Sequence, residues 1–580
     1  MIHGVHECST TPDPRYMNLA QGAILRDSEG AARMQWWRGA IIYQIYPRSF
    51  QDTNGDGIGD LPGVTRRLSH LASLGVDALW ISPFFKSPMV DFGYDIEDYR
   101  EVDPLFGTIE DFDALLAEAH RLGLKVVIDM VLSHTSQRHR WFQESRRSRE
   151  NARADWYVWA DPRPDGTPPN NWLSMFGGSA WTWEPRRRQY YLHNFLPEQP
   201  DLNLHLRAVQ DALLDECRFW LNRGVDGFRL DACNCLTHDL DLRDNPVRPA
   251  GMAPTEAVRP SNPYNYQMHV YNKSRPETLE FLGRLRALTD EYGDILLIAE
   301  IAADDSLSVM RDYAGPAAPL HTAYSFALLG PEFDPRTVTG AVAAFHAEGV
   351  GNRPGRDGWP SWAFSNHDVE RVMSRWGGRD APADFAKALI ALLCSLRGTV
   401  FLYQGEELGL PEADVPYEQL KDPYGLNFFP DFAGRDGCRT PMPWDDSDRH
   451  AGFSTVDGWL PIPNDHLRRA VGAQAADPAS VLSFTRHFLR WRAARPALVS
   501  GDIDIVAATE DVICVIRTLD RRRLLVAIEL AGRGGSVDLP ETVVQVEEDH
   551  HLALGWVEGD RIILPPYGAV FAWLEDQLVA

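Results

Sequence analysis

The sequence predicts an α/β protein built on a (β/α)8 TIM barrel, with a loop-rich insertion after the third strand and a C-terminal antiparallel β domain. Three observations predict this fold. Short β-rich runs alternate with amphipathic helical stretches, and eight such strands are found. Four acidic residues each follow a short apolar run, and from about residue 499 apolar residues recur at every second position.

The alternation can be followed along the chain in order. The expected strands are residues 40–46, 77–82, 125–132, 227–231, 295–301, 321–328, 362–366 and 399–404. The expected helices between them include residues 70–74, 112–122, 208–221, 278–288 and 383–396. In 208–221 the apolar side chains recur at steps of three and four, which is the period of a helix with one buried face.

Two regions depart from the alternation. Residues 135–204 lack a helical period and are rich in Trp, Pro, Asn and Gly, so we expect them to form an insertion that walls a pocket on one face of the barrel. The alternating apolar pattern of residues 499–580 predicts a small β domain. The barrel then comprises 35–134 and 205–498, and residues 1–34 are an N-terminal extension.

Composition excludes several classes of function. The 580 residues are 44% apolar, enough for a large core, and carry a net charge of −25. That charge repels nucleic acids and anionic membrane surfaces, so neither is expected as a partner. The seven cysteines are scattered along the chain, so we expect them to be reduced thiols rather than disulfides. Residues 1–34 do not contain the apolar core of a signal peptide, and no run of residues is apolar enough to span a membrane. We therefore expect a cytoplasmic enzyme.

The four acidic residues at the strand ends are the main indication of a functional site: Asp129, Asp231, Glu300 and Asp368. A carboxylate is costly to desolvate at the end of a buried strand, so it usually has a function there. In a parallel barrel the carboxyl ends of the strands meet at one face. We therefore expect these four side chains to share one site.

The residue types at these positions predict a division of roles. Arg229 lies two residues before Asp231, on the same side of a strand, and would keep that carboxylate ionised and oriented, as a nucleophile requires. Glu300 has no basic neighbour in sequence, so burial would raise its pKa and suit it to act as a general acid. A pair of this kind cleaves glycosidic bonds, and Asp368 would add negative charge beside an oxocarbenium ion.

These segments resemble the conserved regions of the α-amylase superfamily, glycoside hydrolase family 13. The matching segments are Asp129-Met-Val-Leu-Ser-His134, Gly227-Phe-Arg-Leu-Asp231, Glu300 and Phe364-Ser-Asn-His-Asp368. Gln199-Pro-Asp-Leu-Asn203 resembles a fifth region, typical of the oligo-1,6-glucosidase and α-glucosidase subfamily. The resemblance extends from about Trp36 to the end of the chain. It implies that Asp231 is the nucleophile, Glu300 the acid/base and Asp368 the stabiliser of the transition state.

The resemblance also implies a pocket for a terminal glucose. Its expected members are Asp91, Tyr94, His134, Phe176, Arg229, His367 and Arg435. Carboxylates there would accept hydrogen bonds from sugar hydroxyls, and the aromatic rings would face the sugar. Alternatives remain for three of them: Phe176 could serve only the core, His134 could be a satisfied buried histidine, and Arg435 could pair with Asp431 or Asp436 instead.

A loop between the first expected strand and helix has the composition of a cation site. Oxygen-bearing side chains alternate with glycines there, and such a loop can wrap a hard divalent cation. By resemblance to the calcium loop of the subfamily, the ligands are Asp52, Asn54, Asp56, Asp60 and the carbonyl of Ile58. We expect structural Ca²⁺, or else Mg²⁺; the alternative is an Asp/Asn/Gly-rich turn without an ion.

Specificity follows from the residue after the nucleophile, which is Ala232. In the subfamily a valine there is typical of α-1,6 enzymes and a smaller or polar residue of α-1,4 enzymes. We therefore expect hydrolysis of maltose-like substrates, with sucrose as a further candidate, and glucosyl transfer to acceptor alcohols. The alternatives are a sucrose isomerase or a trehalose synthase, which share the three carboxylates, and a non-enzymatic relative, which would lack them. The sequence leaves monomer and homodimer open.

Overall fold

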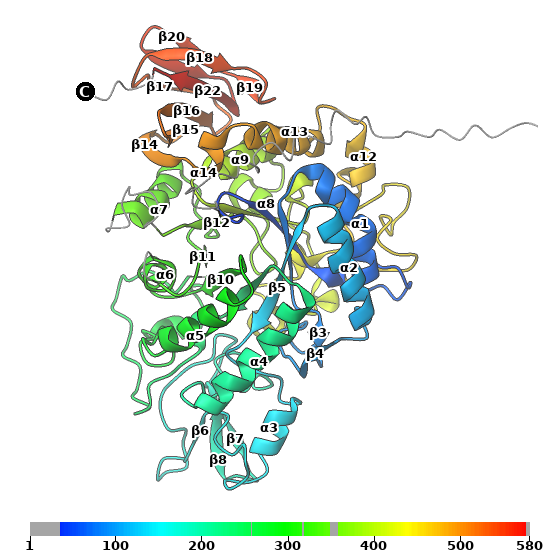
Figure 1. Cartoon of the computed structure of the whole chain (residues 1–580), viewed down its shortest axis with the longest axis vertical. Helices are drawn as coiled ribbons and strands as arrows, with labels where there is room; N and C mark the ends of the chain where they lie inside the picture. The colour runs from blue at the N-terminus through cyan, green and yellow to red at the C-terminus, as the bar shows by residue number, and fades with distance from the viewer. Residues whose placement is uncertain (1–34, 257, 316–317, 348–357, 576–580) are drawn as a thin grey trace, which may run out of the picture. The chain divides into compact units, whose positions relative to one another are not determined.

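The computed structural model describes residues 35–256, 258–315, 318–347 and 358–575, so the N-terminal extension proposed for residues 1–34 lies outside the described residues. Eight parallel strands close into a barrel, because β1 pairs with both β2 and β13 (Figure 1). The barrel strands are β1 (Ile41–Ile45), β2 (Ala78–Ile81), β5 (Lys125–Val131), β9 (Gly227–Asp231), β10 (Leu296–Ile301), β11 (Thr322–Ser325), β12 (Ser361–Ala363) and β13 (Thr399–Tyr403). The predicted (β/α)8 barrel is confirmed.

The barrel interior is a packed core. Its strands are buried on both faces, which explains why they appear in the sequence as apolar runs rather than as alternating patterns. Trp80 of β2 meets Tyr324 of β11 and Phe401 of β13 edge to face, with ring centroids 5.6 and 5.8 Å apart. These rings fill the space between strands that are not neighbours in the sheet.

Helices follow the barrel strands, as expected. The structure contains α1 (Leu61–Leu74), α2 (Ile109–Arg121), α3 (Arg140–Ser145), α4 (Arg207–Arg223), α5 (Thr278–Asp290), α6 (Ser306–Ala314), α7 (Pro335–Ala347), α8 (Val372–Gly377), α9 (Ala383–Ser395), α10 (Pro423–Phe428), α11 (Asn464–Arg468), α12 (Val471–Ala475), α13 (Val481–Ala493) and α14 (Pro496–Ser500). The helix expected at 70–74 begins nine residues earlier, after the N-cap Asp60. The first turn of this helix was not predicted because it contains Pro62 and Gly63, which disfavour a helix interior, although proline is well tolerated in a first turn.

Two long segments leave the barrel on the side of the strand ends. The first follows β5 and contains α3 and an antiparallel sheet of β6 (Trp159–Ala160), β8 (Gln189–Leu192) and β7 (Trp181–Glu184), drawn in cyan in Figure 1. The second runs from β9 to α5, and its described residues form short 3-10 turns at Cys233–Cys235 and Pro263–Tyr266 but no longer helix or strand. The sequence analysis did not separate this second segment from the alternation. A shorter hairpin, β3 (Phe85–Lys86) and β4 (Asp98–Val102), follows β2.

The predicted C-terminal antiparallel β domain is confirmed. Its larger sheet has the order β14 (Asp502–Ala508), β15 (Val512–Leu519), β16 (Arg522–Glu529), β22 (Gly568–Leu574) and β18 (Val543–Glu547), with β19 (Ala553–Leu554) beside β22. A smaller sheet joins β17 (Gly535–Asp538), β21 (Arg561–Leu564) and β20 (Trp556–Glu558).

The alternation of β15 and β16 has a clear cause. Ile513 and Val515 join the main core of the barrel, whereas Val512 and Cys514 join a second core within the C-terminal domain. Both faces of this sheet are therefore buried near its centre. The domain limits proposed from the sequence remain predictions.

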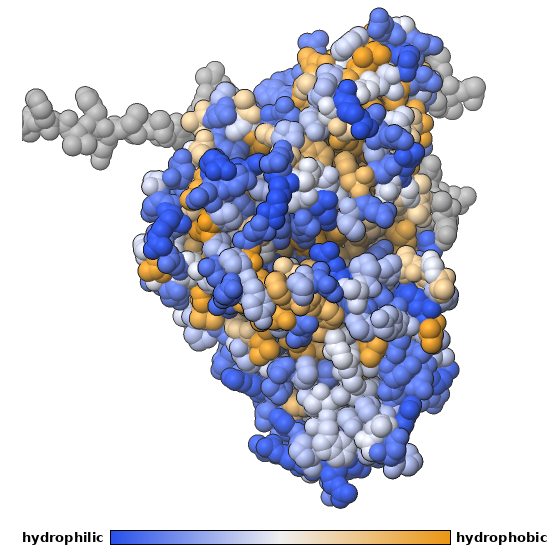
Figure 2. Space-filling model, turned by 180° about the vertical axis from the view of Figure 1, so that it is seen from behind, coloured by the Kyte–Doolittle hydropathy of each residue, from blue (hydrophilic) through white to orange (hydrophobic). Residues whose placement is uncertain are grey.

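The surface is mixed in character. Hydrophilic residues cover much of the face drawn in Figure 2, and apolar residues gather around its middle. In the part of the chain that the structure describes, no helix combines the length and the apolar character needed to cross a membrane.

Candidate active site

A pocket of about 800 Å³, its open mouth included, lies at the carboxyl ends of the barrel strands. Eight of the residues predicted for catalysis or sugar binding line it: Asp91, Tyr94, His134, Phe176, Asp231, Glu300, Asp368 and Arg435. The remaining two, Arg229 and His367, are fully buried and contact residues that line it. The structure thus brings together all the residues that the sequence predicted for this site.

Arg229 organises the acidic groups. It is fully buried on β9, and its Nη1 lies 2.7 Å from Oδ1 of Asp231 and 3.0 Å from Oδ1 of Asp129, while its Nη2 forms an ion pair with Glu300. Asp129 reaches it because residues 129 and 229 are opposite each other in the β5–β9 pair. The guanidinium lies over the ring of Trp80, 4.9 Å from its centroid. One cation therefore holds three carboxylates in fixed positions.

Burial sets the protonation of the central pair. It raises the pKa of Glu300 to about 8, as the sequence analysis expected. It also raises the pKa of Asp231 to about 7, so the expectation that Arg229 keeps this pKa low is wrong. Burial outweighs the opposing effect of the Arg229 guanidinium on this pKa, and the negative charge of Asp129 adds to the rise. The pKa of Glu300 is the higher of the two, which suits Glu300 to donate a proton and Asp231 to act as the nucleophile.

Asp368 has a different environment. It lies beyond the end of β12, where Arg435 and Arg439 donate to its Oδ1 over 3.1 and 2.8 Å. Burial alone would raise its pKa, but neighbouring positive groups outweigh burial, and its pKa lies well below the ordinary value. His367 contributes little charge at neutral pH, because burial lowers its own pKa to about 3. Asp368 is therefore a stable negative charge beside the reacting pair.

Arg435 connects the loop after β13 to the pocket. It binds Asp422 over 2.7 Å, Asp91 over 2.9 Å and Asp368 over 3.1 Å. The alternative that it pairs with Asp431 or Asp436 is therefore not found. Its guanidinium also lies 5.3 Å from the ring of Phe176. These contacts fix two carboxylates, Asp91 and Asp368, at positions where sugar hydroxyls can reach them.

Phe176 and His134 each have both of the roles considered for them, as pocket residues and as buried residues of the core. Phe176 lines the pocket and also packs against Tyr424, with ring centroids 5.1 Å apart. His134 is buried, its Nε2 lies 3.2 Å from the carbonyl oxygen of Tyr94, and burial lowers its pKa to about 4. It is neutral at pH 7, so it can exchange hydrogen bonds with a ligand without adding charge.

Tyr94 and His367 form a second polar pair in the pocket. Their rings are stacked at 8°, and the Tyr94 hydroxyl lies 2.6 Å from Nε2 of His367. Gln44 of β1 lies 2.7 Å from the other ring nitrogen, Nδ1, and the Tyr94 hydroxyl donates to Asp129 over 3.2 Å. A chain of contacts thus extends from the barrel interior to the pocket wall.

The sequence analysis missed several members of the site. Gln199 donates to Asp91 over 3.1 Å and lies in the fifth-region motif, which was the signal available for it. Arg439 and Asp422 gave no sequence signal, because their roles depend on contacts between distant loops. The other residues lining the pocket are Met175, Phe195, Ala232, Asn234, Cys235, Ala302, Phe326 and Tyr424.

The predicted metal ligands lie in a turn that leads into α1. Asp52, Asp56 and Asp60 accept hydrogen bonds from main-chain N–H groups of the turn, for example Asp52 Oδ1 from Gly55 over 2.8 Å. Carboxylate, amide and carbonyl oxygens suit Ca²⁺ chemically. Within the described residues, however, the one group of at least three His, Cys, Asp or Glu ligand atoms within 4.8 Å of one another lies elsewhere. The calcium site stays a prediction.

Comparison with known proteins agrees with the fold and the pocket. Residues 44–501 match the model of the alpha-amylase catalytic domain. A probable alpha-glucosidase of Rhizobium meliloti (strain 1021) is 54% identical over 542 residues, which cover 93% of this chain and 97% of that protein.

Two solved structures are similar as well. The alpha-glucosyl transfer enzyme XgtA has a TM-score of 0.91 and 53% identity, with 94% of this chain and 100% of that chain covered. The trehalulose synthase MutB of Pseudomonas mesoacidophila MX-45 has a TM-score of 0.83 and 32% identity, with the same coverage. The chain belongs to the alpha-amylase family of glycosidases.

Proposed function

We propose that this enzyme is a retaining, exo-acting α-glucosidase that hydrolyses short α-glucosides and also transfers glucose to alcohols. The observation that carries this proposal is the pair formed by Asp231 and Glu300, which line one pocket and are bound to the same guanidinium. Asp231 attacks the anomeric carbon while Glu300 gives its proton to the departing oxygen. Glu300, now ionised, then takes a proton from water or an alcohol, which displaces Asp231 from the glucosyl ester.

The distribution of polar groups favours one orientation of the substrate. Asp91 and Arg435 come from loops after β2 and β13, whereas Ala232, Ala302 and Phe326 come from segments after β9, β10 and β11. These two sets of strands lie on different sides of the closed barrel. We assign the polar side to the glucose that is transferred and the less polar side to the leaving group or acceptor.

Linkage preference is assigned from the leaving-group side. Ala232 is small and lines the pocket immediately after the nucleophile. A small residue leaves room for the 4-linked sugar of maltose, and we extend the same argument to sucrose.

The six described cysteines are buried and unpaired, which supports a cytoplasmic setting. We propose Ca²⁺ as a structural ion and small α-glucosides as the partners, for a monomer or a homodimer.

A sucrose isomerase or trehalose synthase activity is the second candidate. The similarity to a trehalulose synthase favours it, because an isomerase would use the same three carboxylates and differ only in what accepts the glucosyl group. In that case the released sugar would stay in the pocket and attack the glucosyl ester through another hydroxyl. Products, rather than rates, separate the two candidates.

The test is to incubate the enzyme separately with maltose, isomaltose, sucrose and trehalose and to resolve all products by chromatography. Free glucose, with maltose consumed faster than isomaltose, supports the glucosidase; new disaccharides without free monosaccharides support the isomerase. Adding a simple alcohol should divert glucose into alkyl α-glucoside, with the α configuration retained. Asp231→Ala should abolish both reactions. Glu118, which is partly exposed and pairs with Arg121 on α2, supplies the control Glu118→Gln, which should react normally.

A further inference from the structure

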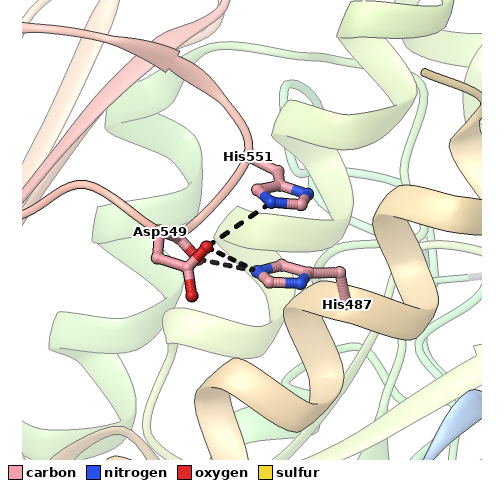
Figure 3. Close-up of side chains that lie close together, drawn as sticks. All are labelled: His487, Asp549 and His551. Carbon is pink, nitrogen blue, oxygen red and sulfur yellow. Dashed lines mark hydrogen bonds and ion pairs between the residues drawn. The ribbon is translucent and has the colours of Figure 1, made fainter. Parts of the chain in front are cut away.

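A cluster of two histidines and an aspartate lies outside the active site (Figure 3). His487 belongs to α13, whereas Asp549 and His551 lie between β18 and β19 of the C-terminal domain. Oδ1 of Asp549 is 3.6 Å from Nε2 of His487 and 3.5 Å from Nε2 of His551. The two imidazole rings are parallel within 5°, with centroids 3.6 Å apart. The mechanism proposed above uses none of these groups.

The cluster is held in place by the residue at its centre. His550, between the two ligand residues, is fully buried against Trp491 of α13 and Phe571 of β22, with ring centroids 6.0 and 4.9 Å away. With His550 anchored in the core, the side chains on either side of it are directed toward His487, as Figure 3 shows. His551 adopts a φ of 61°, a backbone conformation that disfavours a residue with a side chain.

We propose that His487, Asp549 and His551 bind a divalent transition-metal ion, with Zn²⁺ as the best fit. Two imidazole nitrogens and one carboxylate oxygen are the donors that Zn²⁺ prefers. Ligands about 2.1 Å from a tetrahedral ion lie roughly 3.4 Å apart, which is close to the two nitrogen–oxygen distances in this cluster. All three ligand atoms lie within 4.8 Å of one another.

The exposure of the ligands decides what kind of site this is. The side chains of His487, His551 and Asp549 are 29%, 51% and 75% exposed, so water can fill the fourth position. A bound ion would join α13, which packs on the barrel, to the C-terminal sheet. We therefore assign the site a stabilising role across these two parts of the fold.

Binding requires one local change. Nε2 of His487 lies 2.7 Å from the main-chain oxygen of Asp549, which can only accept, so this nitrogen carries the proton in that contact. The metal needs its lone pair, and the proton must move to Nδ1. The competing interpretation is a His–Asp–His cluster joined by hydrogen bonds and charge alone, which would have no affinity for zinc.

The test uses the full-length enzyme, freed of metals and then saturated with Ca²⁺ so that the Asp52–Asp60 loop is not available to zinc. Zn²⁺ alone is titrated by calorimetry, and Tm is measured with and without it. The wild type should bind one more Zn²⁺ than His551→Gly, and saturating zinc should raise its Tm by about 2 °C. His551→Gly is chosen because glycine tolerates the positive φ at this position, so the variant should fold.

Two further variants sharpen the result. His487→Ala removes the ligand on the helix and should lose the same zinc ion, whereas His120→Ala, which changes another half-exposed histidine paired with an aspartate, should keep it. Co²⁺ in place of Zn²⁺ should give visible absorption typical of low coordination number in the wild type and in His120→Ala only. Equal zinc binding and equal Tm shifts in the wild type and His551→Gly would overturn the proposal.

Discussion

Arg229 shows how one residue sets the chemistry of the pocket. A single guanidinium is in contact with three carboxylates, so it cannot neutralise all of them. Burial then raises the pKa of both Asp231 and Glu300, and the ordering of these values decides which group acts as nucleophile and which as acid. The arrangement works because the pair shares one proton near neutral pH.

The pH dependence of kcat/KM should report this pair. Activity needs ionised Asp231, which is present above its pKa of about 7, and protonated Glu300, which is present below its pKa of about 8. We therefore expect kcat/KM for maltose to follow a narrow bell-shaped curve against pH, with its maximum between pH 7 and 8. The profile is measured from initial rates at low substrate concentration.

The variant Glu300→Gln tests whether Glu300 causes the fall of kcat/KM at high pH. The variant should lose roughly 10²- to 10⁴-fold in kcat/KM on maltose, but much less on a 4-nitrophenyl α-glucoside, whose leaving group needs no proton. On the aryl substrate the fall at high pH should disappear, while the fall at low pH, caused by Asp231, should remain. A basic limb that persists in this variant would show that another group supplies the proton.

The residues of the site were predictable to different degrees. Asp231 is the last residue of β9 and Glu300 the last but one of β10, and these positions alone predicted both a shared site and the raised pKa of Glu300. The pKa of Asp231 was not predictable, because burial outweighs the contact with Arg229 and because Asp129 adds a negative charge from another strand. Arg439 was missed for a similar reason: it reaches Asp368 from a segment 71 residues further along the chain.

At the scale of elements, the end of β9 controls the leaving-group side of the pocket. Ala232 follows the strand with φ 41° and ψ 43°, and its N–H donates to Glu300 over 2.8 Å. This left-handed conformation turns the chain sharply after the nucleophile. The same residue thus orients the acid and limits the space beside it.

Ala232→Val should shift the linkage preference from maltose toward isomaltose. The added methyl groups narrow the side where a 4-linked sugar would lie, and a change of this size in a pocket is worth roughly 10-fold or more in the ratio of kcat/KM values. Valine should also lower stability, because a β-branched side chain is more strained than alanine in this left-handed conformation. Ala232→Gly is the control and should keep the wild-type ratio. An unchanged ratio in Ala232→Val would remove this residue from the account of specificity.

The loop that leads into α1 is an element whose role can be tested separately. It is tied to a distant segment, since Asp52 donates its N–H to Phe453 and Trp459 donates to Gly57, each over 2.9 Å. A cation in the loop would strengthen this connection. None of the predicted ligands lines the active-site pocket.

Removal of Ca²⁺ by chelation should therefore lower Tm by about 2 °C while KM changes little. Re-addition of Ca²⁺ should restore Tm, and Asp56→Asn should weaken the response. The same experiment in His551→Gly separates this loop from the proposed zinc site, because the calcium response should persist there. Identical melting with and without the chelator would mean that the loop is a turn without an ion.

The fold was more predictable than its boundaries. The strands of the barrel were visible because they are buried on both faces, and those of the C-terminal domain because they alternate. The start of α1 was missed because Pro62 and Gly63 disfavour a helix interior, and the segment between β9 and α5 was missed because it has no period at all. Irregular segments are held by individual contacts, which sequence patterns do not record.

At the scale of the whole molecule, Arg517 joins the barrel to the C-terminal sheet. It lies fully buried on β15, and its guanidinium donates to the main-chain oxygens of Ser395 and Leu396 at the end of α9 and of Leu498 and Gly501 around the end of α14, over 2.7 to 3.1 Å. These carbonyls have no further helical partners, and the negative ends of both helices meet there. The cation thus satisfies groups from both parts of the fold.

Arg517→Met should consequently destabilise the whole enzyme rather than its active site. Methionine fills much of the same space but leaves buried carbonyl oxygens without donors, at a cost of roughly 1–3 kcal/mol for each unsatisfied group. We expect Tm to fall by several degrees, with KM and the pH profile unchanged, because no contact of Arg517 reaches a residue that lines the pocket. Arg533→Ala, which breaks an exposed pair with Asp511, is the control and should alter Tm little. If Arg517→Met melted like the wild type, apolar packing between α9, α14 and β15 would be sufficient to hold the two parts together, and the buried cation would be dispensable.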